Sequence, residues 1–377
     1  MHFNLSEEQA MLQASTARFI DQQYSFEVRE KDVRLPEGFN RDTWATFAEL
    51  GWLSVPISEA GGGFGGNAAD TMVIMEELGK GLVASPYIPT VMLFGSFVDL
   101  GAPDILKQNL LEPLIAGQLQ GAFAYQERQS RYNLADVKTT ATREGESYVL
   151  NGEKTLVMNG ATANQIVVSA RINGEQFDTA GISLFVIDAN APGVHKTSYR
   201  LMDGQLVANI RFENLSVASS QLLGEEGDGY SLIEKVVNNT VLALCAEAMG
   251  IMVKLTDTTR EYTKARKQFG APISSFQVLQ HRMVDMFMAC EQTRSLLFRA
   301  VCSVGTTDAD RSLHALKYMI GRNGRMICNE AIQLHGGMGV TDELDVGHYV
   351  KRLMVINTMF GDADHHQQRL AQISLPT

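Results

Sequence analysis

The chain has 377 residues, of which 45% are hydrophobic and 20% are charged, as in ordinary soluble globular proteins. This length allows two or three structural units with substantial cores. The net charge of −11 and a pI near 5.3 argue against binding of nucleic-acid phosphates through the overall field, so we expect no nucleic-acid partner.

Cysteine usage and the search for targeting segments give a simple picture. The four cysteines fall in apolar, helix-like stretches, and no CxxC pair or Cys/His spacing predicts a metal site. Buried free thiols in a reducing compartment are the simplest interpretation. The first residues lack the features of a secretory signal, and no uncharged apolar stretch reaches the roughly 20 residues of a membrane helix. We therefore expect a cytoplasmic protein without a membrane partner.

The N-terminal segment, residues 1–118, has helical periodicity from Leu5 to about Gly117. Ser6 and Gln9 have the spacing of a capping box, which marks the start of a first helix. A glycine run at 61–66 precedes a further helix, and glycines in such a place can cradle a phosphate. Neither GxxxxGK[ST] nor a strand–GxGxxG–helix unit is present, so the run predicts a turn, with a phosphate loop as the alternative.

The middle segment, residues 119–225, changes to short extended stretches punctuated by Gly and Asn, such as Lys154–Met158 and Gln165–Arg171. This spacing predicts a small antiparallel β-barrel or sandwich. Crossover helices are missing, so a doubly wound nucleotide-binding fold is not expected.

The C-terminal segment, residues 226–377, returns to helical periodicity in four long stretches that we expect to pack as a four-helix bundle. The predicted helices are Tyr230–Gln268, Phe276–Ser303, Asp308–Leu334 and Val346–Leu370. The fold class is therefore α+β, with an N-terminal helical domain, a middle β domain and a C-terminal bundle.

Two motifs in the C-terminal segment give the chain a specific likeness. Residues 266–273 read RKQFGAPI and are followed by Phe276-Gln277, and residues 333–339 read QLHGGMG. Both are similar to signatures of the acyl-CoA dehydrogenase family, RxxFGxPI…FQ and QxxGGxG, and the helix–β–helix order resembles that family along essentially the whole chain.

The resemblance implies an FAD site shared across a subunit interface. The matching residues in the C-terminal segment are Arg266, Phe269, Gln277, Gln333, Gly336 and Gly337, the last three implied to reach the cofactor of the neighbouring subunit. A planar guanidinium suits a pyrophosphate, and glycines let backbone approach phosphates closely. The alternative is that Phe269-Gly270 is a helix C-cap and Gly336-Gly337 a turn.

In the middle segment, the resemblance places Tyr125 and Gln126 on a strand beside the isoalloxazine and Leu156 and Met158 on its other side. Many family members have Thr where Gln126 stands and Trp where Leu156 stands. Without that Trp, we expect the flavin edge to be packed differently or more openly.

The catalytic base that the resemblance implies is missing. The family's usual glutamate stands in a Tyr-Glu-Gly-Thr motif, and Gly361 occupies its position here. Some members carry the base on the first long C-terminal helix, at the position of Thr240, so the second usual solution is absent too. In either case the Gly361 amide could still donate to a thioester carbonyl.

Three alternatives remain open for the base. Glu247 lies two helical turns after Thr240, within roughly 20° of the same helix face, in an otherwise apolar run. A carboxylate in such a run is a candidate base, or a structural glutamate held by a buried Arg or by backbone. Asp362, one residue past the usual position, is a weaker candidate, because catalysis tolerates little misplacement. The third alternative is that this subunit has no base. His365 and His366 point too far apart for one site and predict a solvated helix start.

Over nearly its full length the chain looks like small subunits of bacterial heteromeric acyl-CoA dehydrogenases, of the pimeloyl-CoA dehydrogenase type. The implied function is FAD-dependent α,β-dehydrogenation of an acyl-CoA, as part of fatty acid metabolism, with electrons passed to an electron-transfer flavoprotein. The implied assembly is a tetramer, either of identical chains or with a homologous partner subunit. The alternatives are a base-deficient subunit of a heteromeric enzyme and a flavoprotein that has diverged to a role outside acyl-CoA chemistry.

Overall fold

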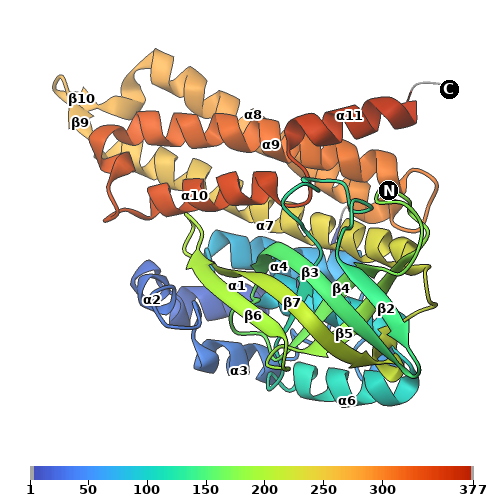
Figure 1. The fold of residues 1–377 in the computed structure, drawn as a ribbon. Helices are drawn as coiled ribbons and strands as arrows, with labels where there is room; N and C mark the ends of the chain where they lie inside the picture. Colours follow the sequence, from blue (N-terminus) through green and yellow to red (C-terminus); the bar gives the residue numbers. More distant parts are fainter. Residues whose placement is uncertain (1–3, 375–377) are drawn as a thin grey trace. The chain divides into compact units, whose positions relative to one another are not determined.

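The structure, a computed structural model, describes residues 4–374 and forms two compact units (Figure 1). The bundle unit comprises the described parts of Met1–Glu30, Ala68–Val83 and Val241–Thr377, and the sheet unit comprises Lys31–Asn67 and Ala84–Thr240. The α+β class and the order of helices, sheet and helices are confirmed. Each unit is defined by which residues pack together, so neither unit coincides with one of the three predicted domains. The predicted domain boundaries at 118/119 and 225/226 were drawn from the change between helical and extended patterns, and they stay predictions.

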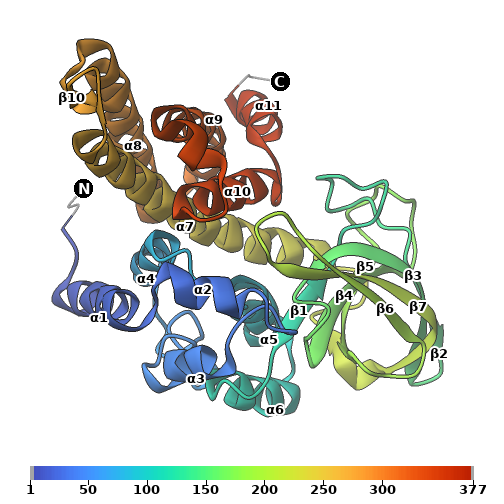
Figure 2. The ribbon, with the colours of Figure 1, turned by 90° about the vertical axis from the view of Figure 1, so that its left-hand side faces the viewer.

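The sheet unit is built on eight strands. Their bounds are β1 (Gly121–Ala124), β2 (Thr140–Glu144), β3 (Ser147–Met158), β4 (Gln165–Arg171), β5 (Ile182–Asp188), β6 (Val194–Arg200), β7 (Leu206–Ala218) and β8 (Leu222–Leu223). Seven form the path β6-β7-β3-β2-β4-β5-β8, and Figure 2 shows them curving round a shared interior. The pairing is mainly antiparallel as predicted, but β1 runs parallel to β4, and β2 meets β4 in one parallel pair.

Side chains alternate between buried and exposed along strands such as β3, and the buried ones form the core of this sheet. On β3, Tyr148, Leu150 and Val157 point inward, where they meet Phe185 and Phe212 from other strands. The pairing of β3 with β7 is irregular between Lys154 and Val157, so the strand bends at the end that carries Leu156.

The sheet unit also contains several helical segments, and the glycine run at 61–66 lies among them. They are α3 (Arg41–Glu49), the single turn η1 (Glu59–Gly61), the π-helical segment η2 (Tyr87–Gly95), α5 (Ser96–Gly101) and α6 (Asp104–Ile115). The amides of Gly61, Gly62, Gly63, Gly65 and Gly66 all donate to carbonyls between residues 55 and 59. Because these donors are used locally, the run is a turn and not a phosphate loop.

The bundle unit is helical apart from one short hairpin. Its helices are α1 (Glu7–Gln23), α4 (Ala68–Lys80), α8 (Gln277–Ser303), α9 (Ala309–His335), the short η5 (Gly336–Val340), α10 (Asp345–Thr358) and α11 (Ala363–Ser374). The hairpin consists of β9 (Lys267–Gln268) and β10 (Ala271–Pro272). Two further helices, α2 (Phe26–Asp32) and α7 (Gly229–Ala265), have residues in both units. The predicted capping box is confirmed, with the Gln9 amide 3.1 Å from Ser6 Oγ and the Ser6 amide 3.0 Å from Gln9 Oε1.

The helix α7 is the longest element of the described residues. Within residues 4–374 it alone is long and apolar enough to cross a membrane, but 83% of its apolar window is buried within the structure. That burial is typical of a core helix.

The predicted fourth C-terminal helix, Val346–Leu370, is wrong as one element. The structure has α10 and α11 in its place, separated by a turn at residues 359–362. Phe360 has a φ of 55° and Gly361 a φ of 121°, and neither value is compatible with a right-handed helix. Periodicity continues across the break, which is why the sequence pattern does not reveal it.

Candidate active site

In the sheet unit, the residues implied to flank the flavin lie together. The Thr155 amide donates to the Gln126 carbonyl at 2.7 Å, which joins the segment after β1 to the bent end of β3. Tyr125 and Gln126 are half-buried, as is Met158, and Leu156 is 39% exposed. Leu156 also has a left-handed φ of 56°, a conformation that bulky residues rarely adopt. The contact of these residues with a flavin stays a prediction.

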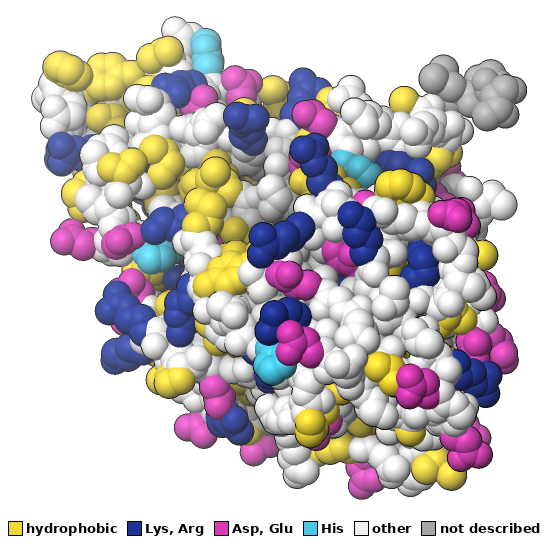
Figure 3. All heavy atoms as spheres, in the orientation of Figure 1, with side chains coloured by type: hydrophobic (Ala, Val, Ile, Leu, Met, Phe, Trp, Pro, Cys, Tyr) yellow, Lys and Arg dark blue, Asp and Glu magenta, His cyan; other side chains and the backbone are white. Residues whose placement is uncertain are grey.

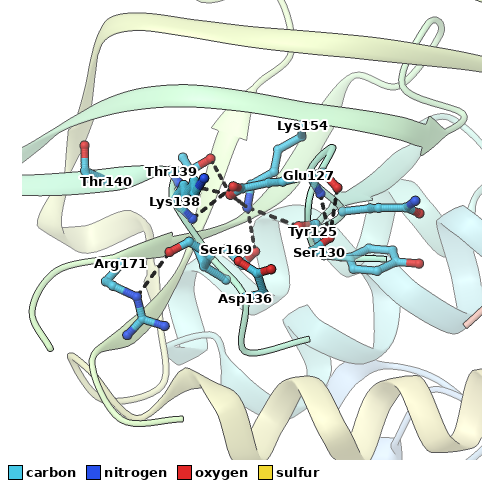
Figure 4. Close-up of polar contacts among 12 residues, drawn as sticks. Tyr125, Glu127, Ser130, Asp136, Lys138, Thr139, Thr140, Lys154, Ser169 and Arg171 are labelled. Atoms are coloured by element: carbon cyan, nitrogen blue, oxygen red, sulfur yellow. Dashed lines mark hydrogen bonds and ion pairs between the residues drawn. The ribbon is translucent and has the colours of Figure 1, made fainter. Parts of the chain in front are cut away.

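A buried ion pair fixes this part of the sheet, and the sequence analysis missed it (Figure 4). The Lys154 ammonium is 0% exposed and lies 2.9 Å from Glu127 Oε1, 3.0 Å from Ser169 Oγ and 3.2 Å from the Tyr125 carbonyl. The Glu127 carboxylate also accepts both the amide and the hydroxyl of Thr139, at 3.0 and 2.8 Å. The signal in the sequence was a lone lysine on an otherwise alternating strand.

The charges of this pair are stabilised by each other. Burial alone would raise the pKa of Glu127, but the Lys154 ammonium and hydrogen bonds from Gln129 and Thr139 lower it to about 2. Burial lowers the pKa of Lys154, and Glu127 opposes that shift. Because Lys154 also holds the Tyr125 carbonyl, the pair positions the segment that carries Tyr125 and Gln126.

In the bundle unit, the first signature motif forms the β9–β10 hairpin. Gln268 pairs with Ala271, and Phe269 and Gly270 form the two-residue connection, with φ values of 54° and 80°. Positive φ at both positions is the pattern of a type I′ hairpin turn. The alternative of a helix C-cap at Phe269-Gly270 is therefore wrong. The turn leaves the Phe269 side chain 92% exposed.

The second signature motif lies at the end of α9 and in η5. Gly336 caps α9, its amide donating to the carbonyls of Gln333 and Ile332, and its φ is 61°. The rings of Tyr262 on α7 and His335 on α9 stack at 4.2 Å, so the ends of these two helices meet. Both signature motifs therefore occupy the same end of the bundle unit.

These groups fit a cofactor with a pyrophosphate and polar ring atoms. The side chains of Arg266, Gln277 and Gln333 make no hydrogen bond or ion pair within the described residues, and all three are exposed. A Cβ on Gly336 or Gly337 would meet nothing within 4 Å, so a ligand can approach the backbone closely at these two positions. The bundle unit thus presents a guanidinium, two carboxamides and open backbone, which is a suitable donor set for phosphates and a flavin.

Glu247 is held by a buried arginine. Its carboxylate is bound by Arg352 through two bonds, Nε to Oε1 at 2.6 Å and Nη2 to Oε2 at 2.8 Å. Glu247 is 8% exposed and Arg352 5% exposed. Both oxygens of this carboxylate are thus engaged by the buried guanidinium. This geometry supports the structural alternative for Glu247 over the role of base.

Close helix packing sets the place of this glutamate. A Cβ on Gly79 of α4 would lie 2.1 Å from the Glu247 carbonyl oxygen, and a Cβ on Gly250 of α7 would lie 1.9 Å from the Glu76 carbonyl oxygen. Only glycine allows α4 and α7 to cross with their backbones in contact. The crossing keeps the Glu247 backbone fixed inside the bundle unit, where Arg352 of α10 binds its side chain.

Position 361 has no room for a side chain. A Cβ built on Gly361 would lie 2.5 Å from His365 Cδ2 and 2.6 Å from His366 Nε2. The two imidazoles thus fill the space in which a residue-361 side chain would begin. The expectation of a solvated helix start is wrong for His366, which is 3% exposed and whose Nδ1 lies 2.8 Å from His314 Nδ1.

The remaining candidate positions have structural bonds. Asp362 begins α11, and its Oδ1 accepts the His365 amide at 2.9 Å, as an N-cap residue does. In the sheet unit, the Thr240 hydroxyl donates to the carbonyls of Val236 and Met92, at 2.8 and 3.2 Å. Catalysis by Asp362 stays a prediction that this geometry does not favour.

Comparison with known proteins identifies the chain's relatives. Family profiles described as acyl-CoA dehydrogenase N-terminal, middle and C-terminal domains match residues 6–118, 122–215 and 227–375. The chain belongs to the acyl-CoA dehydrogenase family. It is accordingly an oxidoreductase and a flavoprotein of that family.

Three relatives illustrate the range of this acyl-CoA dehydrogenase family. The chain is 30% identical to the probable acyl-CoA dehydrogenase YngJ of Bacillus subtilis, covering 98% of each chain. It is 26% identical to the caffeyl-CoA reductase-Etf complex subunit CarC of Acetobacterium woodii, covering 98% of this chain and 99% of that one. The solved structure of PigA with FAD and proline has 26% identity, a TM-score of 0.92 and 99% coverage of both chains. The likeness to heteromeric small subunits stays a prediction.

Proposed function

We propose that this chain takes part in FAD-dependent α,β-dehydrogenation of an acyl-CoA thioester, with the carboxylate base supplied by a homologous partner subunit. The observation that carries the proposal is the filled space at Gly361, where the imidazoles of His365 and His366 exclude any side chain. The bidentate bond of Glu247 to Arg352 supports this proposal, because it argues against the strongest alternative base.

The cofactor is FAD. The open donors of Arg266, Gln277 and Gln333 and the exposed glycine backbone at 336–337 support it, as does the FAD in the PigA relative. When bound, FAD supplies the acceptor of the substrate's β-hydride. On the protein side, the guanidinium would balance pyrophosphate charge, and the carboxamides would hydrogen-bond polar ring atoms.

Within this chain, the contribution to catalysis is binding and polarisation. Removing the α-proton of a thioester leaves negative charge on the thioester oxygen, so a donor aimed at that oxygen lowers the barrier. The buried Gly361 amide donates to no other described residue and is the group that we assign to this task. The proton itself goes to the partner's carboxylate.

An exposed apolar surface supports a partner subunit. On α8, four large apolar side chains are 47–66% exposed, namely Val278, Val284, Phe287 and Met288. Figure 3 shows apolar side chains gathered at the end of the bundle unit where β9 and β10 lie, and Phe269 belongs to that end. Surfaces of this kind on a helix are typical of subunit interfaces, in agreement with a tetramer of like or homologous chains.

We infer that electrons leave the reduced flavin to an electron-transfer flavoprotein in the cytoplasm. The support is the relative from an Etf-containing complex, which is similar along its whole length. The acyl chain of the substrate follows from neither the sequence nor the contacts above.

The test is an anaerobic visible spectrum of the purified chain with a panel of acyl-CoA thioesters. We expect the flavin of the chain alone to stay oxidised, or the chain to purify without FAD, and bleaching to occur once a homologous partner is co-expressed. Bleaching by the chain alone would contradict the missing base and would make Asp362 the first residue to change. No bleaching in any combination, with FAD bound, would instead favour a flavoprotein outside acyl-CoA chemistry.

A further inference from the structure

A fully buried lysine holds the turn that carries Gly361. The Lys317 ammonium on α9 donates to three carbonyls, Ile356 at 2.8 Å, Asn357 at 3.1 Å and Gly361 at 3.0 Å. It is 0% exposed, and within residues 4–374 no carboxylate lies within 4.0 Å of it. Its three protons are therefore all used on backbone at the C-terminal end of α10, where the helix dipole favours a cation.

The backbone in this turn is strained. Phe360, a bulky residue, has a φ of 55°, and Gly361 follows with a φ of 121°. The left-handed conformation of Phe360 costs of order 1–3 kcal/mol and persists only where the surroundings over-determine it, whereas glycine adopts a positive φ without that cost. Something must therefore hold the turn against relaxation.

A histidine pair provides the second restraint. His366 Nε2 lies 3.2 Å from the Phe360 carbonyl, and His366 Nδ1 lies 2.8 Å from His314 Nδ1. With Nε2–H of His366 donating to the carbonyl, its Nδ1 can accept the Nδ1 proton of His314 only if the His366 ring is neutral. Burial supports this state, because it lowers the pKa of His366 to about 2 and that of His314 to about 4.

Lys317 of α9 and His366 of α11 thus bond the four carbonyls of residues 356, 357, 360 and 361. The Gly361 amide, in contrast, has no acceptor among the described residues. A simple helix cap needs no strained residue and no unpaired buried amide. We propose that Lys317, supported by His366, is a positioning residue that fixes the Phe360–Gly361 turn so that the Gly361 N–H is presented to the thioester carbonyl of the substrate. This inference rests on the proposed acyl-CoA function and needs no base in this chain.

The proposal is tested by the absorption band of 4-(dimethylamino)cinnamoyl-CoA bound to the FAD-loaded protein, with the partner subunit present if loading requires it. This unsaturated thioester cannot be dehydrogenated, and its band moves to the red when the carbonyl is polarised. We expect a red shift with the wild type and loss of most of it in Lys317→Met. The probe's Kd should change by less than about fivefold, because one oriented hydrogen bond contributes about 1 kcal/mol or less to net binding. In turnover with acyl-CoA, kcat should fall about 10²-fold and KM should change little, as when an oxyanion donor is lost.

Controls separate positioning from stability. Lys80→Met removes the lysine bonded to Glu77 at 2.7 Å in the same unit and should leave the band in place. His366→Phe keeps a ring but loses the donor to the Phe360 carbonyl, and it serves if Lys317→Met does not fold; it should lose part of the shift. A full red shift in a folded Lys317→Met or His366→Phe protein, or a wild type that binds the probe without any shift, overturns the inference. Failure of the wild type to bind the probe would overturn the acyl-CoA function as well.

Discussion

Glu247 and Arg352, 105 residues apart in the chain, form a bidentate ion pair inside the bundle unit, with bonds of 2.6 and 2.8 Å. The pair joins α7 to α10, whose last turn leads to Gly361. A glutamate in an apolar helix thus has its charge balanced by a partner on another helix, which is the arrangement that buried charges require.

The first prediction concerns this pair. Glu247→Gln should lower the free energy of unfolding by about 3–5 kcal/mol, because it leaves the Arg352 guanidinium buried without its counter-ion. Glu247→Leu combined with Arg352→Met should recover much of that loss. Urea unfolding of the two variants measures both effects. If Glu247 were a base, Glu247→Gln would keep its stability and FAD and would lose only flavin reduction in the anaerobic assay.

The second prediction concerns the closed space at Gly361. Gly361→Ala should destabilise the protein by about 2–5 kcal/mol, from the glycine-only φ and from overlap with the imidazoles. Gly305→Ala is the matched control, because Gly305 also has a positive φ, 79°, but nothing within 4 Å of its Cβ, and it should cost only about 1–2 kcal/mol. Gly361→Glu should not create a self-sufficient dehydrogenase. A stable Gly361→Glu chain that bleaches its flavin with an acyl-CoA would show that the imidazoles move aside.

The third prediction is a pH dependence from Glu127. The carboxyl has a folded pKa of about 2 against an ordinary 4.5, so the folded protein binds its proton more weakly than the unfolded chain. Its stabilising contribution is therefore complete above about pH 4.5 and is lost as the pH falls towards about 2. Urea midpoints measured from pH 6 down to pH 3 should fall more steeply for the wild type than for Glu127→Gln.

The same variant has an effect at neutral pH. Glu127→Gln leaves the buried Lys154 ammonium without its anion and should cost about 3–5 kcal/mol at pH 7. Glu153→Gln is the control, since its ion pair with Arg128 is exposed and should contribute less than about 1 kcal/mol. Equal losses in the two variants would mean that the buried pair does not stabilise the sheet unit.

The fourth prediction concerns the apolar surface of α8. Phe287→Glu replaces an apolar side chain that is 59% exposed with a charged one. It should disrupt subunit association and, with it, the retention of FAD. Thermal unfolding of the separated chain should stay cooperative. Light scattering coupled to size exclusion, together with the flavin absorbance, measures both. Phe177→Glu changes a similarly exposed ring on the sheet unit and should alter neither. An unchanged oligomer in Phe287→Glu would exclude this face as the interface.

The sequence by itself determined the order of helix, sheet and helix, because the period of the apolar residues is a local property that a strand or helix imposes directly. It also indicated the family, through residues 266–273 and 333–339, since such motifs are read from adjacent positions. The absence of the usual glutamate at Gly361 stays a prediction from the same resemblance.

Only the tertiary structure decided what the remaining charged residues do. Glu247 had the pattern of a base or of a structural anion, and its bond to Arg352, 105 residues away, favours the structural anion. Lys154 and Lys317 have partners on segments distant in the chain, at Glu127 and Gly361. The break at residues 359–362 was hidden as well, because buried hydrogen bonds from α9 and α11 hold its strained backbone. Contacts between distant segments depend on how the elements pack, and periodicity does not encode them.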